Sequence, residues 1–410
     1  MARPFGQGTR RWIGWADGGN ELSLPRDVRL LVAVQVLWGL GFGLIGPLQP
    51  LYLVSLGADP SQIGLVFGVG NIVGGLLVLP AGAIADRHGR RIVIVASGVS
   101  GTIGALSLVL LDRWEWAFAS SILYWAGTAA LPVMSAHVAA VASRAVLGRA
   151  MGTVYGAFFV GFIVASPLAG TLAAHFGMRG AILIGAIFFG LSTAATLRLP
   201  SGRGAHLLAP GRFPRAFWAL LALAPIGAFV AVLPTPLLPV YVREVAGSPL
   251  ELVGIYIACL SLGSALFSAT AGRLADRFGA APAVIANAMV LTIGCAMAAL
   301  LASNGVFVAI GLVLAGANVA SNPVLAALLE RIVPPARLAL GYASFQLVYA
   351  AGFGAGGIVA GSLYDADPHL PLLVTVALAL PIAVVIALVV ARITRSDAPP
   401  APLVESRRTT

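Results

Sequence analysis

Side chains that could catalyse a reaction are few and scattered along this chain of 410 residues. The five histidines and fifteen acidic residues form neither a carboxylate pair nor a set with metal-ligand spacing. Every basic residue is an arginine, which excludes a phosphate-binding loop that depends on lysine. Cys259 and Cys295 lie in apolar stretches, where they are interpreted as small packed residues rather than a disulfide or metal site. The sequence therefore predicts a protein that is not an enzyme and carries no metal or cofactor.

Polar and aromatic residues recur instead within apolar stretches, in steps of three or four that place them on one face of a helix. Such faces could line a site for an uncharged, amphipathic compound, because no acidic residue falls at the centre of a predicted helix. Contact between neighbouring helices is the alternative interpretation for any one of them. The candidates for the substrate cavity are Gln35, Trp38, Phe42, Gln49, Tyr52, Tyr124, Thr128, Tyr155, Asn318, Asn322, Tyr342, Gln346 and Tyr349.

The elements that must carry these residues are membrane helices. Only 10% of the residues are charged and 59% are hydrophobic, whereas a soluble domain has about 25% charged residues. A helix needs about 20 apolar residues to cross a bilayer, and the net charge of +10 does not indicate nucleic-acid binding, because the arginines lie between the apolar stretches. The sequence predicts an all-α integral membrane protein with twelve transmembrane helices, near residues 28–54, 61–85, 91–111, 116–141, 148–174, 180–197, 215–242, 250–275, 281–302, 304–330, 338–363 and 370–392.

The distribution of arginine predicts the orientation, because arginine favours the cytoplasmic side of a membrane. With both termini cytoplasmic, every arginine except Arg113, Arg179 and Arg243 falls on that side. We therefore expect a multi-pass protein of a cell membrane, of the bacterial inner-membrane type. The expected organisation is a cytoplasmic tail over 1–27, a six-helix bundle over 28–197, a cytoplasmic loop over 198–214, a second six-helix bundle over 215–392 and a disordered cytoplasmic tail over 393–410.

An internal repeat joins the two halves of the chain. Three separated blocks of the first half recur 189 to 191 residues later. The matched blocks are Pro47–Tyr52 with Pro236–Tyr241, Gly82–Gly89 with Gly272–Gly279, and Gly170–Leu172 with Gly361–Leu363. Repeats of this kind are typical of transporters whose substrate site lies near the middle of the membrane, between the two halves.

The segment Gly82–Arg91 resembles the signature loop of the major facilitator superfamily, in which glycine, Asp-Arg and Gly-Arg-Arg follow one another between helices 2 and 3. The resemblance covers roughly residues 25 to 395 and implies two pseudo-symmetric six-helix bundles. It also implies that Asp86 docks near the cytoplasmic start of helix 11 and closes the inner side in one state. The second copy of the loop has Ala280 and Ala281 in place of the trailing arginines, so we expect a weaker latch there. The motif residues expected to control gating are Gly82, Asp86, Arg87, Gly89, Arg90, Arg91, Gly272, Asp276, Arg277 and Gly279.

Helix 5 carries Gly161, Pro167 and Gly170, which allow close packing and a bend. Drug:proton antiporters of this superfamily often place an arginine four residues before a glycine in helix 4. Here Leu123 stands at that distance from Gly127, which leaves coupling to protons or other ions open.

The predicted function is secondary active transport of a small lipophilic or amphipathic compound by alternating access, in the direction of efflux, as in the drug-efflux-like branch of the superfamily. The predicted partners are a small-molecule substrate, protons as candidate coupling ions, and the lipid bilayer, with the protein acting as a monomer. Uptake of a neutral metabolite such as a sugar or nucleoside is one alternative. A non-transporting membrane receptor or assembly factor is an alternative of another class.

Overall fold

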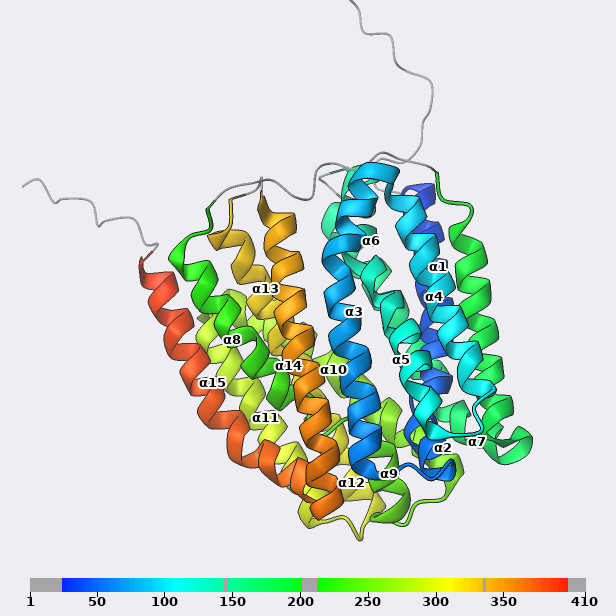
Figure 1. The fold of residues 1–410 in the computed structure, drawn as a ribbon. Helices are drawn as coiled ribbons and strands as arrows, with labels where there is room; N and C mark the ends of the chain where they lie inside the picture. Colours follow the sequence, from blue (N-terminus) through cyan, green and yellow to red (C-terminus); the bar gives the residue numbers. More distant parts are fainter. Residues whose placement is uncertain (1–23, 144–145, 201–211, 335–336, 397–410) are drawn as a thin grey trace, which may run out of the picture.

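The computed structural model describes residues 24–143, 146–200, 212–334 and 337–396. The described residues form helices joined by short connections, arranged as one upright bundle (Figure 1). The start of α1 and the end of α15 lie at the same end of this bundle, called the terminal end (top in Figure 1). The opposite end, at which α2 and α9 lie, is called the far end.

The first half of the chain supplies the helices from α1 to α7. Short 3-10 segments, η1 and η2, precede and interrupt the fourth predicted helix. The bounds are α1 Arg26–Ile45, α2 Gln49–Ser55, α3 Pro60–His88, α4 Arg90–Val109, η1 Trp114–Trp116, α5 Ala117–Ala126, η2 Gly127–Ala129, α6 Ala130–Val141 and α7 Leu147–Thr196.

The second half repeats this order, including the break within its fourth predicted helix. The bounds are α8 Arg215–Val232, α9 Leu238–Glu244, α10 Leu250–Phe278, α11 Ala280–Leu300, α12 Gly305–Ala315, η3 Gly316–Val319, α13 Ser321–Ile332, α14 Leu338–Ala366 and α15 Leu370–Ser396. The helix α15 continues four residues beyond the predicted boundary at 392. Most of the two predicted cytoplasmic tails and of the predicted loop over 198–214 lies outside the described residues.

Local sequence explains where several helices begin and end. Asp59 caps α3, because its carboxylate accepts a hydrogen bond from the backbone N–H of Gln62 at 2.7 Å and the Gln62 side chain bonds the Asp59 N–H in return. Gly89 ends α3 with a φ of 94°, and Gly279 ends α10 with a φ of 93°. A residue with a Cβ atom rarely adopts this conformation, so glycine is required at both turns.

Eleven helices among the described residues are long and apolar enough to cross a bilayer, which confirms an integral membrane fold. One of them, α7, has 50 residues and would extend for about 75 Å at 1.5 Å per residue if it were straight. Gly177, with a φ of 72° and ψ of 162°, interrupts its helical geometry. The sequence predicted two helices with a loop here, whereas in the structure the chain changes direction at a single glycine. The count of twelve membrane crossings stays a prediction.

Two equivalent tyrosines show that the halves share their internal contacts. The hydroxyl of Tyr52 donates a hydrogen bond to the backbone carbonyl of Leu111 at 2.9 Å. In the second half the hydroxyl of Tyr241 donates to the carbonyl of Ala298 at 3.0 Å. Both tyrosines are buried. Each ties the short helix at the far end to the end of the third long helix of its own half.

The two halves meet through α3 against α14 and α7 against α10. Near the far end these helices approach so closely that a Cβ atom at Gly254 would overlap the carbonyl oxygen of Ser166, and one at Gly64 would lie 2.6 Å from the carbonyl oxygen of Gly357. Toward the terminal end, by contrast, a Cβ atom at Gly152 of α7 would meet no described atom within 4 Å. The halves are therefore in contact at the far end. Nearer the terminal end, the face of α7 that carries Gly152 has no described neighbour within this distance.

Candidate functional site

Eight rings of the first half contact one another in what we call the aromatic cluster. Phe42 of α1 lies at its centre, with ring centroids 5.5 Å from Tyr124, 6.0 Å from Trp125, and 5.7 Å from both Phe158 and Phe162. Tyr124 and Phe189 are buried, whereas the other rings are partly exposed although they belong to the interior of a helical bundle. The members are Trp38, Phe42, Phe67, Tyr124, Trp125, Phe158, Phe162 and Phe189.

The aromatic cluster continues into the second half through α14. Phe67 of α3 lies 6.1 Å from Phe353, and Phe353 stacks on Tyr349 with centroids 6.1 Å apart and an interplanar angle of 22°. The side chain of Tyr349 is in turn hydrogen-bonded to that of Asn322 on α13. A continuous series of contacts therefore leads from aromatic rings in one half to amide side chains in the other.

Each half contains a small, partly open cavity, and the two cavities occupy equivalent places. Residues of α1, α4, η2, α6 and α7 line the first, which has a volume of about 30 Å³. Residues of α8, α11, η3, α13, α14 and α15 line the second, of about 60 Å³. Ser97 and Asn287, 190 positions apart, correspond across the repeat, as do Gly127 and Asn318, 191 positions apart. This correspondence supports the internal repeat and reveals where its copies differ.

The side chains that fill the first cavity are missing from the second. Trp38 and Phe189 project rings into the first cavity, and their counterparts in the second are Gly227 and Ala379. The smaller side chains leave the larger volume. The second cavity also has the more polar lining. It has the amides of Asn287 and Asn318 where the first cavity has Ser97 and Gly127.

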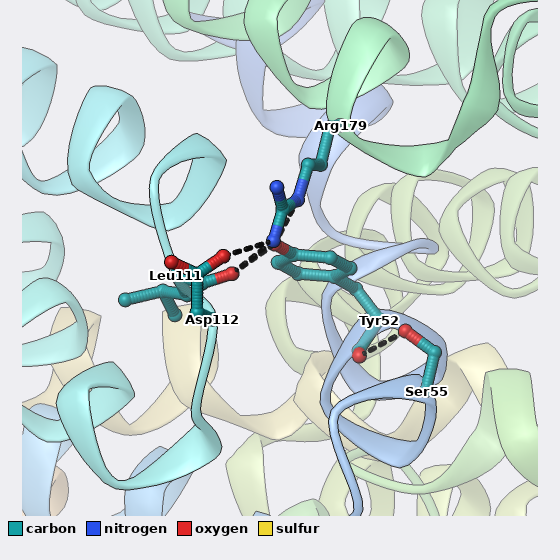
Figure 2. Close-up of polar contacts among 5 residues, drawn as sticks. All are labelled: Tyr52, Ser55, Leu111, Asp112 and Arg179. Carbon is teal, nitrogen blue, oxygen red and sulfur yellow. Dashed lines mark hydrogen bonds and ion pairs between the residues drawn. The ribbon is translucent and has the colours of Figure 1, made fainter.

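Figure 2 shows that Tyr52 belongs to a polar contact at the far end. Besides donating to Leu111, its hydroxyl accepts a hydrogen bond from Nε of Arg179 at 3.0 Å. Nη2 of Arg179 also contacts the carboxylate of Asp112 at 2.8 Å. Gln49 begins the short helix that carries Tyr52. The structure therefore does not bring Tyr52 together with the cavity candidates, because its hydroxyl joins α2 to the end of α4 and to α7 beside the interruption at Gly177.

Three other cavity candidates make side-chain hydrogen bonds of their own. Tyr155 is hydrogen-bonded to Ser135, and the Thr128 hydroxyl donates to the carbonyl of Trp125 at 2.7 Å. Tyr342 donates to the Glu330 carboxylate at 2.9 Å. Two glutamines differ in exposure: Gln35 of α1 is buried and Gln346 of α14 is partly exposed. Among the described residues, no group of three His, Cys, Asp or Glu side chains could hold a metal ion.

The predicted gating loops have the backbone that their glycines suggested. Arg90 is buried to 93% just after the turn at Gly89, and Nη2 of Arg91 donates to the carbonyl of Leu197 at 2.6 Å. Arg90 is therefore buried against protein rather than lying at the membrane surface. Arg91 connects the loop to the end of α7. In the second half the guanidinium of Arg277 lies 5.1 Å from the ring centroid of Phe278. The docking of Asp86 against helix α14 stays a prediction.

The small residues predicted to bend helix 5 serve close packing. A Cβ atom at Gly161 would overlap the Val36 carbonyl of α1, and one at Gly170 would overlap the Leu250 carbonyl of α10. Pro167 lies between them within α7. The non-helical geometry recorded in α7 is at Gly177 rather than at these positions.

Comparison with known proteins agrees with this architecture. The family model of the Major Facilitator Superfamily matches residues 31–260 and 220–409. The chain belongs to the major facilitator superfamily. It is therefore a multi-pass membrane protein of a transporter family rather than an enzyme.

Among the relatives of this transporter are two proteins named for drug resistance. One is the multi-drug resistance efflux pump PmrA homolog of Lactococcus lactis subsp. lactis, 25% identical over 259 residues, or 59% of this chain and 64% of that protein. The other is the multidrug resistance protein MdtG of Yersinia enterocolitica, 27% identical over 283 residues, or 63% of this chain and 68% of that protein. The alignment with the first thus spans less than two thirds of that relative.

Solved structures show the same fold at low identity. A mutant of the nucleoside transporter NupG has a TM-score of 0.73 and 16% identity, covering 89% of this chain and 99% of that one. A bacterial homolog of the human lysosomal transporter Spinster, in an inward-facing and occupied conformation, has a TM-score of 0.75 and 17% identity, covering 91% of this chain and 98% of that one.

Sequence reasoning missed several residues that the structure places with the candidates. Trp125, Phe158 and Phe162 join the aromatic cluster, and Asn287 lines the second cavity. Aligning the repeat position by position would have found Asn287, because its counterpart 190 positions earlier is a serine.

Proposed function

We propose that this transporter moves a small, uncharged lipophilic or amphipathic compound across the membrane by alternating access, in the direction of efflux. The observation that carries the proposal is the aromatic cluster and its continuation through Phe353 and Tyr349. Aromatic rings offer large apolar faces that tolerate ligands of varied shape. The cluster itself contains no acidic or basic side chain, so a charged substrate would be desolvated there without a partner.

The packing between the halves supports the transport cycle. The close approaches at Gly64, Gly170 and Gly254 hold the far end shut, whereas Gly152 of α7 faces open space nearer the terminal end. A conformation closed at one end is one of the two that alternating access requires. The relative named as a multi-drug resistance efflux pump homolog favours export over uptake.

Flux into proteoliposomes tests the proposal. We expect purified protein to move radiolabelled chloramphenicol, an uncharged amphipathic probe, faster than protein-free vesicles do. Phe42→Ala should weaken its apparent affinity by about tenfold, because Phe42 contacts four rings. Phe176→Ala is the matched control, since Phe176 lies on α7 with 65% of its surface exposed, and it should leave the affinity unchanged.

Uptake of a neutral metabolite is the second candidate function, favoured by the amide side chains of Asn287, Asn318 and Asn322 in the second cavity. The same vesicles decide between the two. Flux of uridine without flux of chloramphenicol would replace the first proposal with the second. Binding of either probe without flux would instead favour a receptor.

A further inference from the structure

The cavity of the second half differs from its counterpart in a way that suggests a ligand. Its polar lining comprises Asn287, Asn318, Ser321, Asn322 and Tyr349, which we call the amide cluster. Asn287 is 95% buried. In the first half the positions equivalent to Asn287, Asn318 and Ser321 hold a serine, a glycine and an alanine. The second half therefore carries buried hydrogen-bonding groups that the shared scaffold does not need.

The hydrogen bonds within the amide cluster do not satisfy all of its donors and acceptors. Nδ2 of Asn318 donates to the Ala231 carbonyl at 3.0 Å, but among the described residues its buried Oδ1 accepts no hydrogen bond. Nδ2 of Asn287 reaches the Ser321 hydroxyl only at 3.4 Å. A buried acceptor without a donor costs about 1–3 kcal/mol. The cluster would regain this free energy by binding a group that donates a hydrogen bond.

The backbone around Asn318 is also suited to a ligand. Asn318 lies in η3, where 3-10 geometry interrupts the fourth predicted helix of this half. Interrupted membrane helices expose backbone groups and are typical of binding sites within transporters. The equivalent interruption in the first half, η2, consists of Gly127, Thr128 and Ala129 and carries no amide side chain.

Volume limits what can enter. A cavity that holds benzene measures about 150 Å³, whereas this one measures about 60 Å³. It therefore accommodates a compact polar group, such as an amide or a hydroxyl, rather than an aromatic ring. Tyr349 lines the cavity and stacks on Phe353, which connects it to the aromatic cluster.

We propose that the amide cluster binds the uncharged hydrogen-bonding group of the substrate, while the aromatic cluster covers its apolar part. The first half would then contribute affinity for lipophilic compounds in general, and the second half would select those that carry an amide or hydroxyl. This assignment rests on the proposed function and defines its substrate class more narrowly: uncharged compounds with an apolar body and one compact donor and acceptor group.

A pair of isosteric ligands tests the assignment. Benzanilide and trans-stilbene have two phenyl rings at similar separation, but only benzanilide has an amide between them. Equilibrium dialysis of purified protein in nanodiscs, against empty nanodiscs, gives the affinity for each. We expect tighter binding of benzanilide by wild-type protein. Asn318→Leu should weaken benzanilide binding by about tenfold and change stilbene binding by less than twofold.

Two further variants keep the test decisive if Asn318→Leu folds poorly. Ala228→Leu fills the cavity from α8 without removing a hydrogen bond, and it should also weaken benzanilide binding selectively. Ser97→Ala, at the equivalent place in the first half, is the matched control and should leave both affinities unchanged.

The outcomes separate this assignment from the proposed function. Equal losses for both ligands in Asn318→Leu and Ala228→Leu would show that the cavity only supports the fold, and would overturn the assignment while the function stands. Equal wild-type affinity for both ligands would overturn it as well. Binding of neither ligand would refute the proposed function and the assignment with it.

Discussion

The two equivalent tyrosines at the far end allow a quantitative comparison of the halves. In Tyr52→Phe the Leu111 carbonyl loses one donor but keeps another, because Nη2 of Arg179 also donates to it. Nε of Arg179 also loses its acceptor, but half of that side chain is exposed, so water can replace the lost bond. The net loss should therefore resemble that of one ordinary hydrogen bond, about 1 kcal/mol. In Tyr241→Phe the Ala298 carbonyl loses the donor that the structure gives it outside the helix. Ala298 lies in the last turn of α11, where carbonyls have no intrahelical partner.

Tyr241→Phe should accordingly destabilise the protein by about 1–3 kcal/mol, since it leaves a buried acceptor unpaired. Thermal unfolding of purified protein in one detergent, followed by intrinsic fluorescence, gives the order of the midpoints. We expect Tyr241→Phe to melt lowest, Tyr52→Phe to melt between it and wild type, and neither to change ligand affinity.

Tyr256→Phe is the control for removing a phenolic hydroxyl, because Tyr256 is buried and has no recorded hydrogen bond among the described residues. A midpoint for Tyr52→Phe at or below that of Tyr241→Phe would refute the reasoning. A loss of ligand affinity in Tyr52→Phe would return Tyr52 to the substrate site.

Three further predictions concern gating and the cavity. Asp86→Asn should slow transport more than Asp276→Asn without reducing the amount of protein in the membrane; equal transport rates for both would count against an asymmetric latch. Gly254→Val places a side chain against a backbone carbonyl of α7 and should open the far end. Distances between spin labels on α2 and α9 should then lengthen, and unchanged distances would contradict this. Trp38→Ala and Gln346→Ala should alter substrate selectivity in vesicle flux; unchanged apparent affinities for every probe would mean that both residues only pack helices.

Sequence patterns predicted the membrane fold well, because the lipid environment imposes a strong constraint on composition. The repeat and the loop motif were equally informative, since Gly89 and Gly279 adopt the same left-handed conformation in the two halves. Helix interruptions were harder to foresee. The breaks at η2 and η3 are made of residues that also occur inside helices, so nothing in their order marks a change of geometry.

The cavity candidates divide into those placed by local periodicity and those placed by tertiary contacts. Trp38 and Phe42 share one face of α1 and both enter the aromatic cluster. Tyr52 follows the same spacing, but the chain leaves α1 at Ile45 and restarts at Gln49, which changes the direction of the face. Periodicity holds only while the helix is continuous, so it could not show that Tyr52 contacts Arg179 instead.

The reversal at Gly177 has a practical consequence for topology mapping. Helical geometry extends almost up to this glycine on both sides, which leaves hardly any loop for an antibody, a protease or an inserted epitope tag. At the matching place in the second half, by contrast, Asp367 and His369 form a turn between α14 and α15, held by a hydrogen bond of 2.7 Å from the His369 backbone N–H to the Asp367 carboxylate. A reporter of which compartment the far end faces therefore belongs in that turn.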